Sequence, residues 1–263
     1  MENTFSDLDI DYLITAVDKA SSAVIKIYQD PQFDTWQKDD ASPLTSADLI
    51  SNEILVNALV NRWPEIPVLS EELLNIFVEG ESPSAYWAID PIDGTKEFIK
   101  RNGEFTINVA LIVDGKPRLG LLAAPALSLL FIGLVGSGAK ERDAGNWKNL
   151  EPIQSVNIHD TSKPISVAVS RSHPSTELNE WLTKFSQHTQ VAMGSSLKFC
   201  LIAQGKVDCY PRFGPTCLWD TAAADAILRS LGGGIYQWNQ NADPVELDYS
   251  QPKNYLNPSF IAY

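Results

Sequence analysis

The stretch from Trp87 to Thr95 carries the residues with the clearest chemical potential in this chain. Its apolar start predicts a buried strand that delivers Asp90 and Asp93 at a tight turn. Two carboxylates in this arrangement suit a hard, oxygen-seeking cation such as Mg2+. Gly94 and Thr95 then begin a predicted helix, whose free N–H groups can hold a phosphate oxygen. The stretch therefore indicates a metal-dependent phosphatase.

Further acids extend this pair into a candidate metal site. Glu71 follows a predicted short strand, although adjacent acids such as Glu71 and Glu72 are also common on a solvated surface. Asp220 begins a predicted helix, and Asp is also a favoured helix N-cap. The predicted all-oxygen cage, for two or three Mg2+ ions, consists of Glu71, Asp90, the Ile92 carbonyl, Asp93 and Asp220. The histidines are scattered and unpaired with cysteine, which does not suit zinc.

Cations in such a cage polarise phosphoryl oxygens and lower the pKa of a bound water, which then needs a proton acceptor. The Thr95 hydroxyl can serve if it passes the proton to a nearby carboxylate, for which Asp48 is the candidate. Asp48 falls in the first turn of a predicted helix, where an acid also favours the helix dipole, so both roles stay open. Haloacid-dehalogenase phosphatases have one residue between their acids, whereas Pro91 and Ile92 separate Asp90 from Asp93. A nucleophilic aspartate and a covalent phospho-enzyme are therefore not expected.

Composition bounds the class of protein. The 263 residues, 44% of them hydrophobic, can form one large domain or two lobes. The net charge of −13 argues against nucleic-acid polymers as partners, and bound cations would reconcile it with an anionic substrate. Neither an apolar run long enough to span a membrane nor a basic-then-apolar leader occurs, so we expect a cytoplasmic protein. The three cysteines, Cys200, Cys209 and Cys217, are expected to be free thiols.

The elements that must position these residues follow from the hydrophobic spacing. Helices are predicted over 7–28 and from Ser46 to the stop at Pro64, with a loop over 38–45 between them. Strands are predicted at 67–70, 87–90, 106–113, 117–124 and 129–135, the last three as an antiparallel meander. Residues 140–163 are polar and are expected to hold the boundary between two lobes.

The second half alternates strands and helices. Strands are predicted at 165–169, 191–193 and 208–210, with helices over 175–185, 197–205 and 221–228 and a rigid loop at 211–215. This pattern predicts an α+β lobe over 1–150 that carries most metal ligands, stacked on an α/β lobe over 151–263 that carries Asp220 and the residues of substrate specificity.

The motifs together resemble the inositol monophosphatase superfamily. They are Glu71-Glu72, the 87–95 stretch and Trp219-Asp220-Thr221-Ala222-Ala223, in the family's order within residues 38–231. The resemblance implies a five-layered α-β-α-β-α sandwich of the sugar-phosphatase type and a Mg2+-dependent, lithium-inhibited phosphomonoesterase. It assigns the metal to the cage above and water activation to Thr95 with Asp48. One departure is Ala224, where the family usually has glycine; its methyl could shift packing near the site.

Within the superfamily the chain is most similar to the 3′(2′),5′-bisphosphate nucleotidase branch. The carrying motifs are Lys96-Glu97-Phe98, Ser170–His173, Gly194–Phe199 and Tyr210–Pro215. The branch implies phosphate and substrate contacts from Gly94, Thr95, Ser170, His173, Gly194, Ser195, Lys198, Arg212 and Asp220. It implies removal of the 3′-phosphate of 3′-phosphoadenosine 5′-phosphate, which yields AMP and clears a by-product of sulfate assimilation, with the sulfated analogue 3′-phosphoadenylyl sulfate as a further candidate.

The sequence leaves open the choice among related functions, the oligomeric state and any peripheral association with a membrane. An inositol monophosphatase or inositol polyphosphate 1-phosphatase is the alternative within this class, and an inactive metal-binding regulatory protein is the alternative outside it. The expected partner is a small bisphosphorylated nucleotide. Oligomeric state and peripheral association with an inner membrane leave no trace in the sequence.

Overall fold

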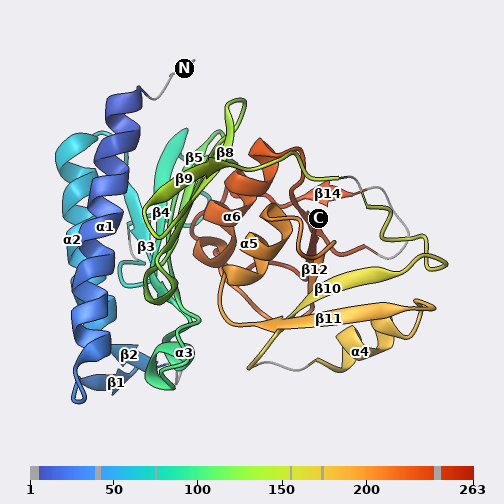
Figure 1. Cartoon of the computed structure of the whole chain (residues 1–263). Coiled ribbons are helices and arrows are strands. Elements are labelled where there is room, and N and C mark those ends of the chain that lie inside the picture. The colour runs from blue at the N-terminus through green and yellow to red at the C-terminus, as the bar shows by residue number, and fades with distance from the viewer. Residues whose placement is uncertain (1–5, 39–42, 75, 155, 173–174, 240–243) are drawn as a thin grey trace.

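Two N-terminal helices cover one face of a seven-stranded sheet (Figure 1). The computed structural model describes residues 6–38, 43–74, 76–154, 156–172, 175–239 and 244–263. Helix α1 (Asp7–Gln29) begins with a capping box between Ser6 and Asp9, and α2 (Ser46–Arg62) with one between Thr45 and Asp48. Their apolar faces pack into one core with the sheet, through side chains that include Leu13, Val17, Val24, Leu55 and Leu59.

The sheet is built in chain order from β3 (Val68–Ser70), β4 (Ala85–Asp93), β5 (Thr106–Val113), β6 (Lys116–Ala124), β7 (Leu129–Leu134), β8 (Gly138–Asp143) and β9 (Asn146–Asn149). Strands β3 and β4 are parallel, and the later pairs are antiparallel. Strand β5 lies between β4 and β6 with seven of its eight residues buried, which explains its continuous apolar character. Asp114 and Gly115 join β5 to β6 with positive φ angles of 49° and 71°, as the Asp-Gly signal predicts.

The opposite face of the sheet is covered by α6 (Leu218–Ser230) and α5 (Leu197–Ala203) (Figure 1). Helix α6 approaches β6 at Gly120, where an added Cβ would lie 2.1 Å from the carbonyl oxygen of Ala223. The contact therefore requires a residue without a side chain. Ala224 is 1% exposed and belongs to the same core cluster as Ala223.

Beyond these helices lie the remaining strands. Strand β10 (Ile165–Ser170) pairs in parallel with β11 (His188–Met193), and a single bridge joins Val167 of β10 to Cys209. A four-stranded sheet has the order β12 (Tyr210–Arg212), β15 (Phe260–Ala262), β13 (Ile235–Gln237) and β14 (Val245–Glu246). Helix α4 (Thr176–Leu182) shares an apolar cluster with β10 and lies on the far side of the molecule from α1 (Figure 1). The chain is thus a mixed α/β fold with alternating layers of helices and strands.

Most predicted elements are confirmed, and the errors have identifiable causes. The loop over 38–45 is wrong at its end, because Pro43–Thr45 forms β2, paired with β1 (Thr35–Gln37); residues 39–42 lie outside the described part. The first part of the polar stretch predicted as a boundary, residues 140–149, instead belongs to the last two strands of the first sheet. Strand β9 is polar because it is an exposed edge. The division into lobes at residue 150 stays a prediction.

Two boundaries in the second half are also corrected. The strand predicted at 208–210 lies at Tyr210–Arg212, because its antiparallel partner is β15, which has no clear periodic signal in the sequence. Arg212 is therefore a strand residue and not part of a loop. Helix α6 begins at Leu218, so Asp220 is its third residue and not its cap. Cys200, Cys209 and Cys217 form no disulfide bond, as expected.

Within the described residues, none of the helices combines the length and apolar character needed to cross a membrane.

Candidate metal and phosphate site

Three carboxylates converge where β4 ends and α6 begins. Asp90, Asp93 and Asp220 each place one oxygen within 4.8 Å of the others. Residues three apart on a regular strand face opposite sides of the sheet. The register between β4 and β5 shifts between Asp90 and Asp93, and this irregularity allows both side chains to reach the same space. Pro91 lies within the irregular part, where the loss of a ladder hydrogen bond is tolerated.

Asp220 is oriented by the start of α6. It is the acid of a capping box at the start of α6, and its Oδ2 accepts a hydrogen bond from the Cys217 N–H at 2.7 Å. The same carboxylate belongs to the cluster with Asp90 and Asp93. The helix start therefore fixes the orientation of Asp220 toward the strand carboxylates.

The electrostatics of the cluster fit a hard divalent cation. Burial, followed by repulsion from Glu71, Asp93 and Asp220, raises the pKa of Asp90 well above its ordinary range. Burial and the Asp93 charge raise the pKa of Asp220 to about 7. Asp90 is 1% exposed, and its Oδ1 has no hydrogen-bond donor. Buried carboxylate oxygens without donors are costly alone and are the ligands that a hard cation needs.

Glu71 lies at the end of β3 and is engaged by a lysine. Lys38 Nζ lies 2.7 Å from Glu71 Oε1 and 2.5 Å from Glu72 Oε1. Burial opposes the charged amine, yet Glu71 and Glu72 raise the pKa of Lys38 overall. Burial raises the pKa of Glu71, against the effect of Lys38. Glu71 lies close enough to affect the pKa of Asp90, but it is not one of the three carboxylates whose oxygens lie within 4.8 Å of one another. No signal in the sequence identified Lys38 as its partner.

Thr95 and Asp48 are brought into contact from different elements. The Thr95 hydroxyl, at the start of α3 (Thr95–Ile99), donates to Asp48 Oδ1 at 3.2 Å and lies 3.3 Å from the Ile92 carbonyl oxygen. Asp48 Oδ2 accepts from the N–H and the hydroxyl of Thr45 at 2.8 and 2.5 Å. Burial, with a contribution from Glu72, raises the pKa of Asp48. Asp48 therefore caps α2 with one oxygen and reaches Thr95 with the other.

Two further polar residues support the cluster. The Ser196 hydroxyl donates to Asp93 Oδ2 at 2.6 Å and itself accepts from Asn108 Nδ2 at 3.0 Å. Both residues are buried, and Asn108 is the register partner of Asp90 on the neighbouring strand. Neither side chain is among the predicted site residues, although Ser196 belongs to the Gly194–Phe199 motif. Asn108 had a readable signal, because it is a polar residue in an apolar strand.

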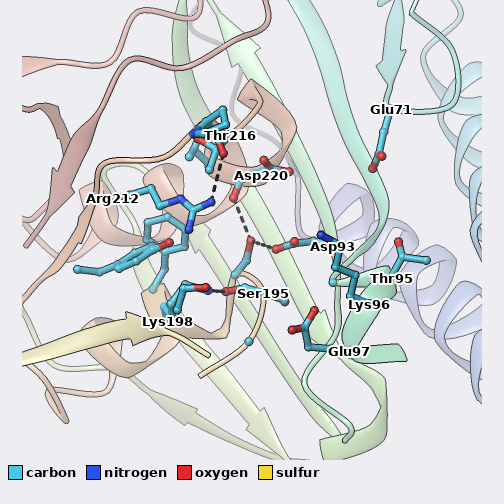
Figure 2. A pocket seen from close by; sticks show the side chains of 18 of the residues that line it. Glu71, Asp93, Thr95, Lys96, Glu97, Ser195, Lys198, Arg212, Thr216 and Asp220 are labelled. Carbon is cyan, nitrogen blue, oxygen red and sulfur yellow. Dashed lines mark hydrogen bonds between the residues drawn. The ribbon is translucent and has the colours of Figure 1, made fainter. Parts of the chain in front are cut away.

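A cavity of about 250 Å3 opens beside these groups (Figure 2). It brings together most of the residues predicted to contact substrate or metal: Glu71, Asp93, Gly94, Thr95, Ser170, Gly194, Ser195, Lys198, Arg212 and Asp220. Asp48, Asp90 and Ile92 do not line it. His173 lies outside the described residues.

The cavity carries positive charge opposite its carboxylates. Figure 2 shows Lys198 and Arg212 on one side, Glu71 and Thr95 on the other, and Asp93 and Asp220 between them. Lys198 is 5% exposed, and burial, with Arg212 nearby, lowers its pKa to about 8. Its Nζ lies 5.1 Å from the centre of the Tyr210 ring. Arg212 Nε is buried without a hydrogen-bond acceptor. An anion in this cavity would satisfy both cations.

Comparisons with known proteins agree with this geometry. The sequence profile of the inositol monophosphatase family matches residues 8–262. The 3′(2′),5′-bisphosphate nucleotidase CysQ of Salmonella typhimurium is 41% identical over 92% of this chain and 94% of its own. That of Escherichia coli K12 is 39% identical over 95% and 98%. The crystal structure of CysQ from Bacteroides thetaiotaomicron superposes with a TM-score of 0.80 at 33% identity, covering 99% of this chain and 98% of that one. Inositol monophosphatase II from Staphylococcus aureus shares the fold, with a TM-score of 0.74 at 19% identity over 98% of this chain and 89% of that one.

Proposed function

The chain belongs to the inositol monophosphatase family, and we propose that within it the protein is a 3′(2′),5′-bisphosphate nucleotidase. Its substrate is 3′-phosphoadenosine 5′-phosphate, from which it removes the 3′-phosphate to leave AMP. The sulfated analogue, 3′-phosphoadenylyl sulfate, is a second candidate substrate. A role in sulfate assimilation, in the cytoplasm, follows from this chemistry.

One observation carries this proposal: the cavity has an acidic end and a basic end. Asp93 and Asp220 lie at the first, and Lys198 and Arg212 at the second. A substrate with one phosphate would need only the cation-binding end. A bisphosphate satisfies both, because its scissile phosphate can lie at the metal cluster while its second phosphate meets the buried lysine and arginine. The relatives at about 40% identity carry the same substrate class in their names.

Mg2+ is the cation that we propose for the cluster, as two or three ions held by Glu71, Asp90, the Ile92 carbonyl, Asp93 and Asp220. Bound there, Mg2+ would polarise the phosphoryl oxygens and lower the pKa of the attacking water. Lithium would compete in such a site. The alternation of helices and strands in Figure 1 supports the five-layered α-β-α-β-α arrangement as the scaffold.

The residues of the chain then do three things. The Thr95 hydroxyl accepts the proton of the attacking water while it donates its own to Asp48 Oδ1, 3.2 Å away. The raised pKa of Asp48 makes its carboxylate a better acceptor near neutral pH. Gly94, Thr95 and Lys96, at the start of α3, line the cavity, and backbone N–H groups at such a position can hold a phosphate. Ser170, Gly194 and Ser195 complete the wall of the substrate pocket. A covalent phospho-enzyme is not required.

The experiment that tests this function is product analysis. The chain is incubated with 3′-phosphoadenosine 5′-phosphate and Mg2+, and the nucleotides are separated by chromatography. AMP and inorganic phosphate in equal amounts are expected, with no product in EDTA and less product with Li+. Adenosine 3′-phosphate as the product would show that the 5′-phosphate is removed and would contradict the proposed orientation.

A further inference from the structure

An ion pair outside the metal cluster joins two segments that lie far apart in the sequence. Glu104 lies between α3 and β5, and Arg171 follows β10. Arg171 donates to both oxygens of the Glu104 carboxylate, from Nε at 2.6 Å and from Nη2 at 2.7 Å. Arg171 Nη2 also donates to the carbonyl oxygen of Ala192 in β11, at 2.8 Å. The pair therefore ties β10 and β11 to the start of β5.

The same carboxylate holds the backbone that enters the cavity. Glu104 Oε2 accepts a hydrogen bond from the N–H of Gly194 at 2.8 Å. A Cβ added to Gly194 would lie 2.8 Å from the Glu104 carbonyl oxygen and 2.9 Å from the Glu104 Cβ. Such contacts are too short for any residue but glycine. The segment 194–196, here called the 194–196 turn, is thus docked directly on Glu104.

The 194–196 turn has contacts on both sides of the cavity. Ser195 adopts a positive φ of 48°, which is costly for a residue with a side chain and persists only where its surroundings enforce it. Its hydroxyl lies 2.7 Å from the Thr106 hydroxyl, and its carbonyl accepts from Lys198 Nζ. Ser196 donates to Asp93 at 2.6 Å. The position of this backbone therefore affects the lysine at the basic end and the aspartate at the acidic end.

We propose that Glu104, oriented by Arg171, is a positioning residue that fixes the 194–196 turn so that Lys198 and Asp93 face one bisphosphate together. The inference rests on the proposed function for the identity of that substrate. Arg171 has an exposed side chain, at 45%, and an ion pair of that exposure alone contributes little. What gives the pair its role is the bond from Gly194 to the carboxylate that Arg171 orients.

Three variants separate this role from that of a simple ion pair. Glu104→Ala removes both the charge and the acceptor for Gly194. Glu104→Gln removes the charge but keeps an oxygen acceptor. The exchanged pair, Glu104→Arg with Arg171→Glu, restores opposite charges, but arginine offers no acceptor to Gly194. Arg142→Gln is the matched control, because it breaks a bidentate pair with Asp18, which joins β8 to α1 and has no residue in the cavity wall.

Two measurements are made on each variant: amide hydrogen exchange of residues 193–197 without substrate or Mg2+, and the KM for 3′-phosphoadenosine 5′-phosphate with Mg2+. Glu104→Ala and the exchanged pair are expected to exchange faster and to raise KM about tenfold, the effect of one hydrogen bond to a charged group. Glu104→Gln and Arg142→Gln are expected to stay within about threefold of the unchanged protein, because each keeps the acceptor.

The inference would be overturned if the variants ranked in the opposite order in hydrogen exchange and KM. If Glu104→Gln matched Glu104→Ala while the exchanged pair recovered, the ion pair alone would matter; equal values in all variants would exclude any role. Hydrogen exchange needs no turnover, so it tests Glu104 independently of the reaction. Absence of turnover in the unchanged protein would instead count against the proposed function.

Discussion

Asp90 and its neighbours form an arrangement that is unfavourable without a cation. Burial and three nearby carboxylates oppose ionisation of Asp90, and one of its oxygens has no donor. Such a buried cluster of carboxylates lowers the stability of the folded protein. Ionisable groups with pKa values shifted in this way are concentrated at functional sites. At the scale of single residues, the proposal therefore depends on acidic side chains that a metal ion would stabilise.

Asp93→Asn tests this dependence. The substitution removes one charge from the cluster while the amide oxygen can still accept from Ser196. Mg2+-dependent phosphate release should fall on the order of a thousandfold, because a ligand that supports the transition-state charge is lost. Thermal unfolding without Mg2+ should not occur at a lower temperature, because like-charge repulsion is relieved.

The control for Asp93→Asn is Asp114→Asn, at the turn between β5 and β6. Asparagine suits the positive φ of 49° found there, so activity and stability should both be kept. Retained activity in Asp93→Asn would remove Asp93 from the metal site.

Lys198 gives a prediction about pH. Burial lowers its pKa to about 8, so its positive charge is present below that pH and is lost as the pH rises through it. The kcat/KM for the bisphosphate should therefore fall above about pH 8, because the second phosphate loses its partner. Lys198→Arg should remove this fall, because arginine stays charged. The measurement is kcat/KM between pH 6.5 and 9.5, with adenosine 3′-phosphate as the substrate that lacks the second phosphate. An unchanged alkaline limb in Lys198→Arg, or the same limb with both substrates, would contradict this assignment.

At the scale of elements, the cluster depends on how closely α6 approaches the sheet. Asp220 is held at the start of α6, whereas Asp90 and Asp93 belong to β4, so the distance between helix and sheet sets the distance between their carboxylates. Gly120 allows this approach, because its position lies against the backbone of Ala223. The packing of β6 against α6, two elements far apart in the sequence, thus helps to set the distances within the site.

Gly120→Ala should move α6 outward. Its Cβ would lie 2.1 Å from the Ala223 carbonyl oxygen, so we expect a loss of about 2 kcal/mol in the free energy of unfolding, as for other overpacked cores. The Mg2+ concentration needed for half-maximal activity should also rise, because Asp220 moves with the helix. Urea unfolding and Mg2+ titration measure the two effects.

Gly214→Ala is the comparison for Gly120→Ala, because its added Cβ would make only an ordinary contact, 3.5 Å from the Arg212 guanidinium. Equal stability of the two variants would show that the helix can adjust, and would weaken the link between α6 packing and the site.

The elements also show what the sequence can and cannot predict. The sequence predicts α1 and α2 from apolar residues that recur with a helical period over many residues. It predicts β5 to β7 from apolar runs separated by turn signals. Strands β13 to β15 have two or three residues each, too few for a period to be recognised. The strand boundary at Arg212 was missed for the same reason, since β15 determines it.

At the scale of the whole molecule, some parts of the candidate site can be predicted from the sequence and others cannot. The acids of the 87–95 stretch carry their chemistry in their spacing, so they can be found from the sequence. The contacts of Lys38 with Glu71, of Ser196 with Asp93 and of Glu104 with Gly194 join residues 33, 103 and 90 positions apart. Such contacts form only when the chain folds, so local sequence patterns do not predict them.

Asp225, a buried acid of α6 outside the cluster, should make global stability depend on pH. Asp225 is fully buried; burial raises its pKa from 3.8 to about 6, although Arg229 opposes the shift. The folded protein therefore binds a proton more tightly than the unfolded chain, and stability from this group is lost as the pH rises from about 4 through 6. Relative to Asp225→Asn, the free energy of unfolding should fall by up to roughly 3 kcal/mol across that interval. Urea unfolding at several pH values measures it, and a constant difference would contradict the raised pKa.

In the proposed function, the cavity selects a bisphosphorylated nucleotide over an inositol ester. The most direct test is the ratio of kcat/KM for 3′-phosphoadenosine 5′-phosphate to that for inositol 1-phosphate, measured with Mg2+. Because the inositol ester leaves Lys198 and Arg212 without an anionic partner, the nucleotide should be preferred by at least about a hundredfold. A preference for inositol 1-phosphate would contradict the account and favour an inositol monophosphatase. Phosphate release from neither ester would favour a metal-binding protein without catalytic activity.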